Sequence, residues 1–303
     1  MRNYLKTAFV TAASIARHNS YCKSSSDYHH QQQQQQQHNN NNINNNNNIN
    51  NKNNDDKRVC ASTTTQLNSN NGNNKNSMVS SSSSSTTSSF PDLGIKYPAL
   101  VVFDLDACLW DKEMYEMSVI PEPGGRVTMG DLNGRGEGVT GVYSGSDRIA
   151  LHKGSLIALQ EHADKTKYPG MKIVLASSAD TPFAERVGRA TLKLLEVLPG
   201  MTVWDLLMRD WDGKDVNQIG RQPPLSSNKA QSHFPRIQQL TGIPYDKMLF
   251  FDDCNWGNHC RMVANACRNS DTGKPVVTHE TPRGIQESDW RQGLEKFAKS
   301  VSK

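Results

Sequence analysis

The feature that most constrains the fold of this chain is a short apolar run that leads directly into two acids. Residues 100–103, read LVVF, are apolar and mostly β-branched or aromatic, which is typical of a strand buried on both faces of a sheet. Asp104 and Asp106 follow at once. Because strands of a parallel sheet deliver their carboxyl ends to the ligand crevice, both carboxylates are predicted to face one site. An isolated Asp-x-Asp is more often a simple strand end and turn, so the remaining sequence must decide.

The first 95 residues differ in composition from the rest. Residues 29–54 are almost entirely Gln and Asn, and 77–89 are nearly all Ser and Thr. Such tracts bury too little apolar area to offset the entropy of ordering, so residues 1–95 are predicted to be a disordered tail and 96–303 a single domain. The tail holds eight Lys/Arg and four Asp/Glu, whereas the domain holds 26 of each. A domain without net positive charge argues against nucleic-acid binding.

Residues 1–26 carry four basic side chains and no acidic one. This composition resembles an organellar transit peptide and is equally typical of a basic disordered tail. No apolar run is long enough for a membrane span, so we expect no membrane partner. The six cysteines include no Cys-x-x-Cys pair, which favours reduced thiols in a cytoplasmic or organellar protein and argues against zinc.

Two more apolar runs, at residues 171–176 and 248–251, have the character of buried strands. Helical patterns separate them, at residues 154–164, 182–195 and 229–241. Alternation of this kind predicts an α/β fold, a three-layer Rossmann-like parallel sheet with helices on both faces. Residues 201–207 are interpreted as a further strand and the polar segment 209–228 as a loop.

The segment 111–150 is rich in glycine and has two short β-prone runs, 126–129 and 139–143. This pattern predicts a small β-hairpin flap. Only 72 residues lie between Asp104 and Ser177, which leaves no room for a large cap domain. The site is therefore expected to be open.

The three predicted strands all end in polar side chains. They are Asp104 and Asp106, Ser177 and Ser178, and Asp252 and Asp253, with Lys229 at the start of the helix before the last strand. Carboxylates suit Mg²⁺, and a metal, an ammonium and hydroxyl groups suit phosphoryl transfer. A carboxylate can also act as the nucleophile. Taken singly, Lys229 is more typical of a solvated helix start than of a catalytic residue, and only its place in this series raises it. Ser177 beside Ser178 could equally cap a helix.

In this order the motifs resemble the haloacid dehalogenase superfamily, and most closely its magnesium-dependent phosphatase branch. The similar segments are FDLDACLW at 103–110, LASSADTP at 175–182, TGIPYDKMLFFDD at 241–253 and QGLEKFAK at 292–299. The resemblance covers residues 96–303 and none of the tail.

The resemblance implies a role for each matching residue. Asp104 would be the nucleophile and a metal ligand, and Asp106 the general acid/base, with its backbone carbonyl also facing the metal. Ser177, with Ser178 beside it, would bind phosphate, and Lys229 would hold the nucleophile and the phosphoryl oxygens. Asp252 and Asp253 would complete the Mg²⁺ site, Asp253 as the stronger candidate for direct contact.

The chain departs from the branch at two positions near these motifs. Cys108 stands where Thr is usual, and Ser178 stands where an arginine often follows the serine. The first change is tolerable if the position only packs the loop, and would slow turnover if a hydroxyl contact is needed. We expect His233 and His259 to have structural or surface roles.

The resulting hypothesis is a monomeric, Mg²⁺-dependent phosphomonoester hydrolase that works through an aspartyl-phosphate. Its substrate would be a phosphoprotein carrying phosphotyrosine or a small molecule such as a sugar-amine phosphate. Two alternatives stay open at this point: a phosphatase of phosphoserine tails on other proteins, and a non-catalytic scaffold whose Gln/Asn-rich tail mediates assembly.

Overall fold

The computed structural model of the protein describes residues 96–302. The predictions of a disordered tail over 1–95 and of a targeting segment over 1–26 lie outside these residues. Within 96–302, no helix combines the length and the apolar character needed to cross a bilayer.

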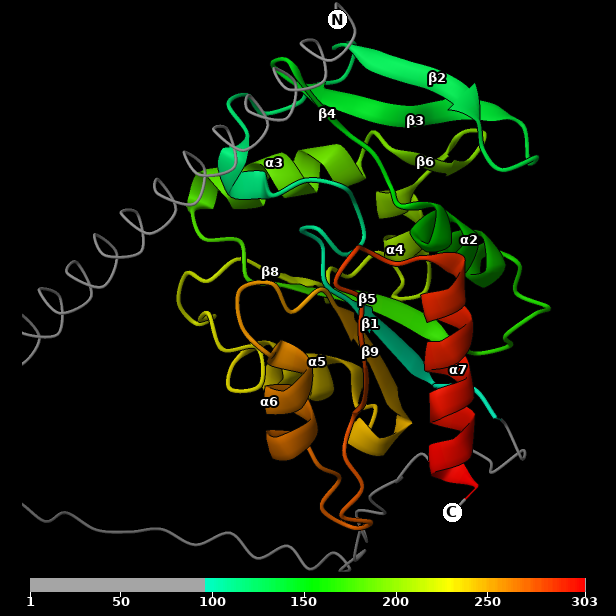
Figure 1. The fold of residues 1–303 in the computed structure, drawn as a ribbon, viewed down its shortest axis with the longest axis vertical. Helices are drawn as coiled ribbons and strands as arrows, with labels where there is room; N and C mark the ends of the chain where they lie inside the picture. Colours follow the sequence, from blue (N-terminus) through cyan, green and yellow to red (C-terminus); the bar gives the residue numbers. More distant parts are fainter. Residues whose placement is uncertain (1–95, 303) are drawn as a thin grey trace, which may run out of the picture. The chain divides into compact units, whose positions relative to one another are not determined.

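A five-stranded sheet forms the centre of the fold, in the order β10-β9-β1-β5-β8, and every neighbouring pair of strands is parallel (Figure 1). Its strands are β1 (Leu100–Phe103), β5 (Lys172–Ser177), β8 (Gln218–Ile219), β9 (Met248–Asp252) and β10 (Val277–Glu280). The three apolar runs of the sequence are the three inner strands. β1, which carries the Asp-x-Asp motif at its end, is the middle strand.

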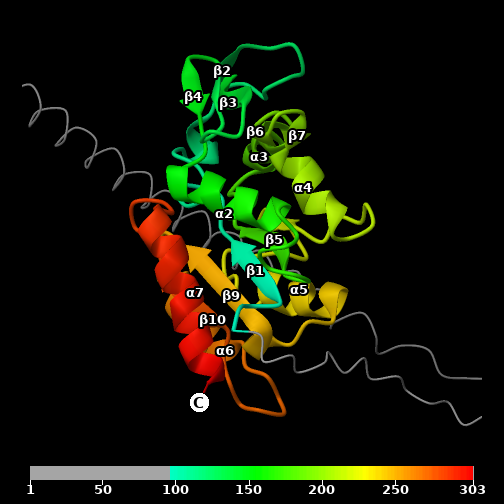
Figure 2. The same cartoon turned by 90° about the vertical axis from the view of Figure 1, so that its right-hand side faces the viewer.

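Alternate residues of the inner strands pack into two separate cores. Val101 and Phe103 belong to one core, and Leu100 and Val102 to the other. The first core lies under helices α2, α3, α4 and α7, and the second under α5 and α6, on opposite faces of the sheet (Figures 1 and 2). These helices are α2 (Lys153–Ala163), α3 (Pro182–Leu192), α4 (Val203–Arg209), α5 (His233–Thr241), α6 (His259–Ala266) and α7 (Glu287–Val301). The predicted three-layer α/β fold is therefore confirmed.

The strand predicted over residues 201–207 is wrong. Only β7 (Met201–Thr202) is extended, paired with β6 (Glu196–Leu198), and α4 begins directly afterwards. A capping box starts this helix: the Thr202 hydroxyl accepts the Asp205 N–H at 3.1 Å, and the Asp205 carboxylate accepts the Thr202 N–H at 3.0 Å. These reciprocal bonds satisfy backbone N–H groups that the start of a helix would otherwise leave unpaired, and so favour a helix here. The predicted loop 209–228 also contains the short edge strand β8.

The glycine-rich segment forms a three-stranded antiparallel sheet, one strand more than the predicted hairpin. Its strands are β2 (Val127–Asp131), β3 (Glu137–Ser144) and β4 (Asp147–Ile149), in that order. Glu196 ties this sheet to β6 by accepting the Val139 N–H at 2.9 Å. Gln160 of α2 donates to the carbonyls of Leu132 at 2.8 Å and Val197 at 3.0 Å. Between β1 and β5 the chain adds only this sheet, the short 3₁₀ helix η1 (Met114–Glu116) and α2, so no large cap domain is present there.

An ionic cluster centred on the buried Glu161 carboxylate joins α2 to α7. The Arg291 guanidinium donates to both oxygens of Glu161, at 2.7 and 2.6 Å, and the Trp290 indole N–H donates at 2.7 Å. Lys167 also pairs with Glu161. Burial alone would raise the pKa of Glu161, but these hydrogen bonds outweigh it and lower the pKa to about 2. The cluster fixes α7 against the outer face of the first core.

Candidate active site

The strand register brings the first and last acidic motifs together. Phe103 of β1 pairs with Phe251 of β9, so Asp104 and Asp252 leave their strands at the same level. The Asp104 N–H donates to the Phe251 carbonyl at 3.0 Å and extends this ladder by one bond. β5 lies on the other side of β1 and ends at Ser177. All three motifs therefore lie at the carboxyl edge of the sheet, where ligand sites of open α/β sheets occur.

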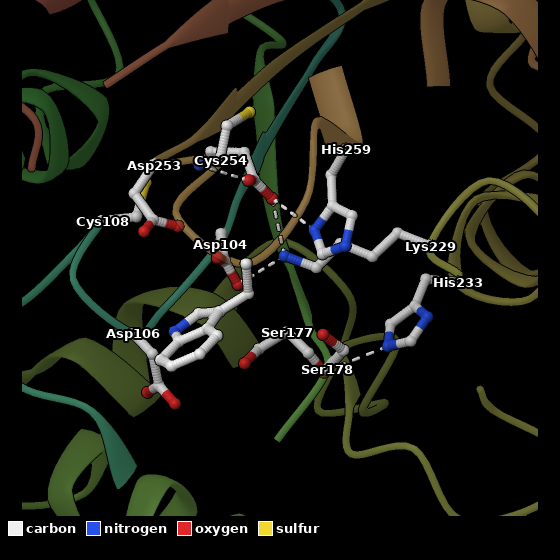
Figure 3. Close-up of polar contacts among 12 residues, drawn as sticks. Asp104, Asp106, Cys108, Ser177, Ser178, Lys229, His233, Asp253, Cys254 and His259 are labelled. Atoms are coloured by element: carbon white, nitrogen blue, oxygen red, sulfur yellow. Dashed lines mark hydrogen bonds and ion pairs between the residues drawn. The ribbon is translucent and has the colours of Figure 1, made fainter. Parts of the chain in front are cut away.

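Lys229 connects two of these motifs. Its ammonium lies 2.7 Å from Asp104 Oδ1 and 2.7 Å from Asp252 Oδ2, and its side chain is 1% exposed (Figure 3). Lys229 lies four residues before α5, in a turn in which its carbonyl accepts the Phe234 N–H at 3.0 Å. The alternative of a solvated helix-start lysine is therefore wrong. Burial would lower the pKa of Lys229, but Asp104 and Asp252 outweigh it and raise the pKa above its usual value.

Three carboxylates surround this ammonium. Asp104, Asp252 and Asp253 offer oxygen atoms that all lie within 4.8 Å of one another, and all three residues are buried. When all groups are ionised, three carboxylates (−3) and one ammonium (+1) leave a charge of −2, which matches a divalent cation. Burial, together with the charges of Asp104 and Asp252, raises the pKa of Asp253 to about 8. Hard oxygen ligands with uncompensated negative charge fit Mg²⁺.

The two acids of the last motif have different surroundings. Asp252 is already engaged: one oxygen contacts Lys229 at 2.7 Å and His259 Nδ1 at 3.3 Å, and the other accepts the Cys254 N–H at 2.9 Å. Burial would raise the pKa of Asp252, but Lys229 and His259 lower it. Asp253 accepts one backbone N–H, from Asn255 at 3.2 Å. Asp253 is thus better suited to direct metal contact, and Asp252 to holding Lys229.

The Asp106 carboxylate lies outside this cluster. It accepts the Trp110 indole N–H and the Met114 backbone N–H, both at 3.1 Å. Burial raises its pKa well above the usual value, and Asp104 adds to the effect. A carboxyl group whose pKa is raised in this way holds its proton to a higher pH than a free aspartate, which suits it to general acid catalysis. Metal contact through the Asp106 backbone carbonyl stays a prediction.

Ser177 ends β5, which pairs with β1 so that Leu175 lies opposite Phe103, and Ser178 follows it (Figure 3). The Ser177 carbonyl accepts the Gly220 N–H at 2.8 Å and contacts His233 Nε2 at 3.0 Å. The Ser178 carbonyl accepts from Arg221 Nε at 3.1 Å. The sequence analysis missed Arg221, which brings a guanidinium to the backbone of the serine pair.

Cys108 is fully buried, and its sulfur lies 3.3 Å from the Thr281 hydroxyl. Burial raises the pKa of the Cys108 thiol well above its usual value. The side chain therefore packs the loop after β1, which favours the tolerant interpretation of the change from threonine.

Two histidines differ in their relation to the site. His233 is buried in the framework beneath Ser177, as expected for a structural residue. For His259 the sequence predicts a structural or surface role, but in the structure its Nδ1 lies 3.3 Å from Asp252 Oδ2. The Asn258 side chain caps α6 by accepting the Arg261 N–H at 2.7 Å, which places His259 at the first position of that helix. In the sequence, the only feature that points to His259 is that it is a polar residue shortly after Asp252 and Asp253.

Comparison with known proteins adds one finding. A family model described as Acid Phosphatase matches residues 96–300, whereas no curated protein matches the chain. The matched region contains the whole parallel sheet and every residue of the site described above. Because this match spans more than half of the sequence, the chain belongs to the acid phosphatase family, a membership that supports phosphatase activity.

Proposed function

We propose that this protein is a Mg²⁺-dependent phosphomonoester hydrolase that works through an aspartyl-phosphate on Asp104. The observation that carries the proposal is the buried group of Asp104, Lys229, Asp252 and Asp253 at the carboxyl edge of the sheet. Its excess charge of −2 would be costly to bury without a cation. The one fixed ammonium in this group also lies against the proposed nucleophile.

The proposed chemistry has two displacements. In the first, a carboxylate oxygen of Asp104 attacks phosphorus, the bond from phosphorus to the ester oxygen breaks, and Asp106 gives its proton to the leaving oxygen. In the second, Asp106 takes a proton from water, the water oxygen attacks phosphorus, and Asp104 leaves as a carboxylate. Inorganic phosphate is released, and Asp106 carries its proton again.

The other side chains position and neutralise the phosphoryl group. Lys229 holds Asp104 and contributes positive charge, and Ser177 and Ser178 would donate hydrogen bonds to the phosphoryl oxygens. The carboxylates of Asp104 and Asp253 and the Asp106 carbonyl would hold Mg²⁺, which when bound supplies charge that offsets the phosphoryl oxygens.

The proposed substrates are bulky phosphate monoesters, because no large cap lies between β1 and β5 in the described chain. Phosphotyrosine and sugar-amine phosphates are the proposed classes, acted on by a monomer. A panel that includes a phosphoserine peptide separates this proposal from the phosphoserine-tail alternative.

The proposal is tested with the full chain and an aryl phosphate such as p-nitrophenyl phosphate. We expect hydrolysis with Mg²⁺, loss of activity in EDTA and recovery when Mg²⁺ is restored. Asp104→Asn should reduce kcat by a factor on the order of 10⁴ or more, because an amide is a very poor nucleophile. Acid-quenched wild-type protein should carry phosphate on the peptide that contains Asp104.

Asp212→Asn is a matched control for the same chemical change. Asp212 is exposed and lies in the loop after α4, where its positive φ of 52° is one that asparagine adopts readily. This variant should retain wild-type activity. Full activity of Asp104→Asn, or wild-type activity that a chelator leaves undiminished, would contradict the proposal.

A further inference from the structure

Two exposed aromatic side chains meet beside the candidate active site. Tyr115 is 40% exposed and Trp256 is 53% exposed. Their ring centroids lie 5.9 Å apart, with an angle of 83° between the ring planes. Such edge-to-face geometry is a favoured arrangement for aromatic pairs. Because so much of both rings remains accessible, the pair has apolar surface with which to contact a ligand.

Both rings are attached to loops that carry proposed catalytic acids. Tyr115 follows Met114, whose backbone N–H donates to Asp106 at 3.1 Å. Trp256 is the third residue after Asp253 and follows Asn255, whose backbone N–H donates to Asp253 at 3.2 Å. The aromatic pair therefore joins the loop after β1 to the loop after β9, next to the proposed acid and the proposed metal ligand.

A hydrogen bond fixes the Trp256 ring. Its indole N–H donates to Glu113 Oε1 at 3.1 Å. Glu113 is also within electrostatic reach of the acidic cluster. Burial raises its pKa, the Trp256 hydrogen bond lowers it and the charge of Asp104 raises it, with a net pKa of about 7. The indole is thus held by a carboxyl group that is itself within electrostatic reach of the nucleophile.

We propose that Tyr115 and Trp256 bind the leaving group of the substrate and give the site a preference for phosphate esters of aromatic alcohols. The inference rests on the proposed hydrolase function and names its substrate class. Because no large cap covers the site in residues 96–302, groups at its mouth must hold whatever extends beyond the phosphate. An aromatic pair offers stacking to a planar ring, as in the side chain of phosphotyrosine, and little to a short aliphatic ester.

Steady-state kinetics of the full chain with phosphotyrosine and glycerol 2-phosphate test this proposal. Trp256→Leu and Tyr115→Leu should each raise KM for phosphotyrosine about three- to tenfold, the range that one aromatic contact supplies, with kcat little changed. KM for glycerol 2-phosphate should change less than twofold. Trp256→Phe should recover most of the lost affinity, because it keeps a stacking surface and loses only the bond to Glu113. Leu240→Ala, which trims a 47% exposed side chain on α5, is the control and should behave as wild type.

An equal rise of KM for both substrates would show that the pair merely supports the loops and would overturn the proposal, as would an unchanged KM for phosphotyrosine.

A binding measurement separates failure of this proposal from failure of the hydrolase proposal. Calorimetry with Asp104→Asn protein should show that phosphotyrosine binds more tightly than phosphoserine, and that adding Trp256→Leu removes the difference. This result supports the aromatic site even if no turnover is found. Equal binding of the two ligands to Asp104→Asn would overturn it.

Discussion

His233 is a single residue on which the framework beneath the site depends. Its Nε2 lies 3.0 Å from the Ser177 carbonyl and 3.1 Å from the Gly220 carbonyl, and its Nδ1 lies 3.0 Å from the Ser232 hydroxyl. Two carbonyl acceptors require a proton on Nε2, so Nδ1 accepts from the hydroxyl and the ring is neutral. Burial lowers the pKa of His233 to about 4, and the charge of Lys229 contributes.

This environment predicts a pH-dependent loss of stability. A free histidine has a pKa near 6.5, so the unfolded chain binds the proton first. The contribution of His233 is complete above pH 6.5 and is lost as the pH falls toward 4, by roughly 3 kcal/mol in total. Between pH 7 and pH 4.5, urea unfolding should show that the free energy of unfolding falls by about 2–3 kcal/mol more in wild type than in His233→Gln.

The control His279→Gln, which changes a partly exposed ring, should follow wild type. A constant difference between wild type and His233→Gln across this range would contradict the prediction.

At the residue scale, the acids could be placed in one site from the sequence because they follow apolar strands. Lys229 could be placed there only through its position in the series of motifs that resembles the family. The partners that tune them could not. His259, Glu113 and Arg221 reach the site through contacts that depend on helix starts and loop paths. No local spacing in the sequence encodes these paths.

At the scale of elements, Gly293 shows why α7 can lie directly on the sheet. A Cβ added at this position would lie 2.4 Å from the ring of Phe251 on β9, well inside van der Waals contact. Phe251 is fully buried and stacks on Phe103, with ring centroids 5.6 Å apart, so it has no room to move away. The glycine therefore sets how closely helix and sheet approach.

We expect Gly293→Ala to destabilise the protein despite its better helix propensity. Alanine in a helix gains about 1 kcal/mol over glycine, whereas overpacking a rigid core costs about 1–3 kcal/mol. The clash should prevail and lower Tm by several degrees in a thermal melt. Gly188→Ala in α3 is the matched control, because its added Cβ would find neighbours only at 3.7 Å or beyond. This control should raise Tm slightly; a Tm increase in both variants would show that α7 can shift away from β9.

The elements themselves were predictable to the extent that their signals were local and strong. β1, β5 and β9 are continuous apolar runs buried on both faces, and the sequence shows them directly. Residues 201–207 are apolar enough for a strand, but the Thr202–Asp205 capping box turns them into a helix. β8 has two residues and pairs only with β5, so its pattern is too short to detect.

At the scale of the whole molecule, charge is distributed unevenly. Residues 96–303 contain 26 basic and 26 acidic side chains and are formally neutral. The carboxyl edge of the sheet nevertheless buries three acids against one ammonium. The fold brings these groups together because parallel strands from distant parts of the chain end at the same edge. The apo protein should therefore be destabilised by its own site, and a bound cation should relieve that repulsion.

This imbalance predicts opposite effects of one substitution on stability with and without metal. At a Mg²⁺ concentration ten times its Kd, binding should stabilise wild type by about 1.4 kcal/mol, or a Tm increase of roughly 3–5 °C for a domain of this size. Melts at pH 9, above the pKa of about 8 of Asp253, keep this carboxyl ionised in the metal-free protein. Asp253→Asn then removes one buried negative charge while keeping an oxygen for the Asn255 N–H. In EDTA this variant should melt above wild type, but Mg²⁺ should no longer raise its Tm. Asp212→Asn should show the wild-type response to Mg²⁺ in the same thermal melts. An equal increase of Tm with Mg²⁺ in Asp253→Asn and in wild type would mean that Asp253 is not a ligand and that the cation binds elsewhere.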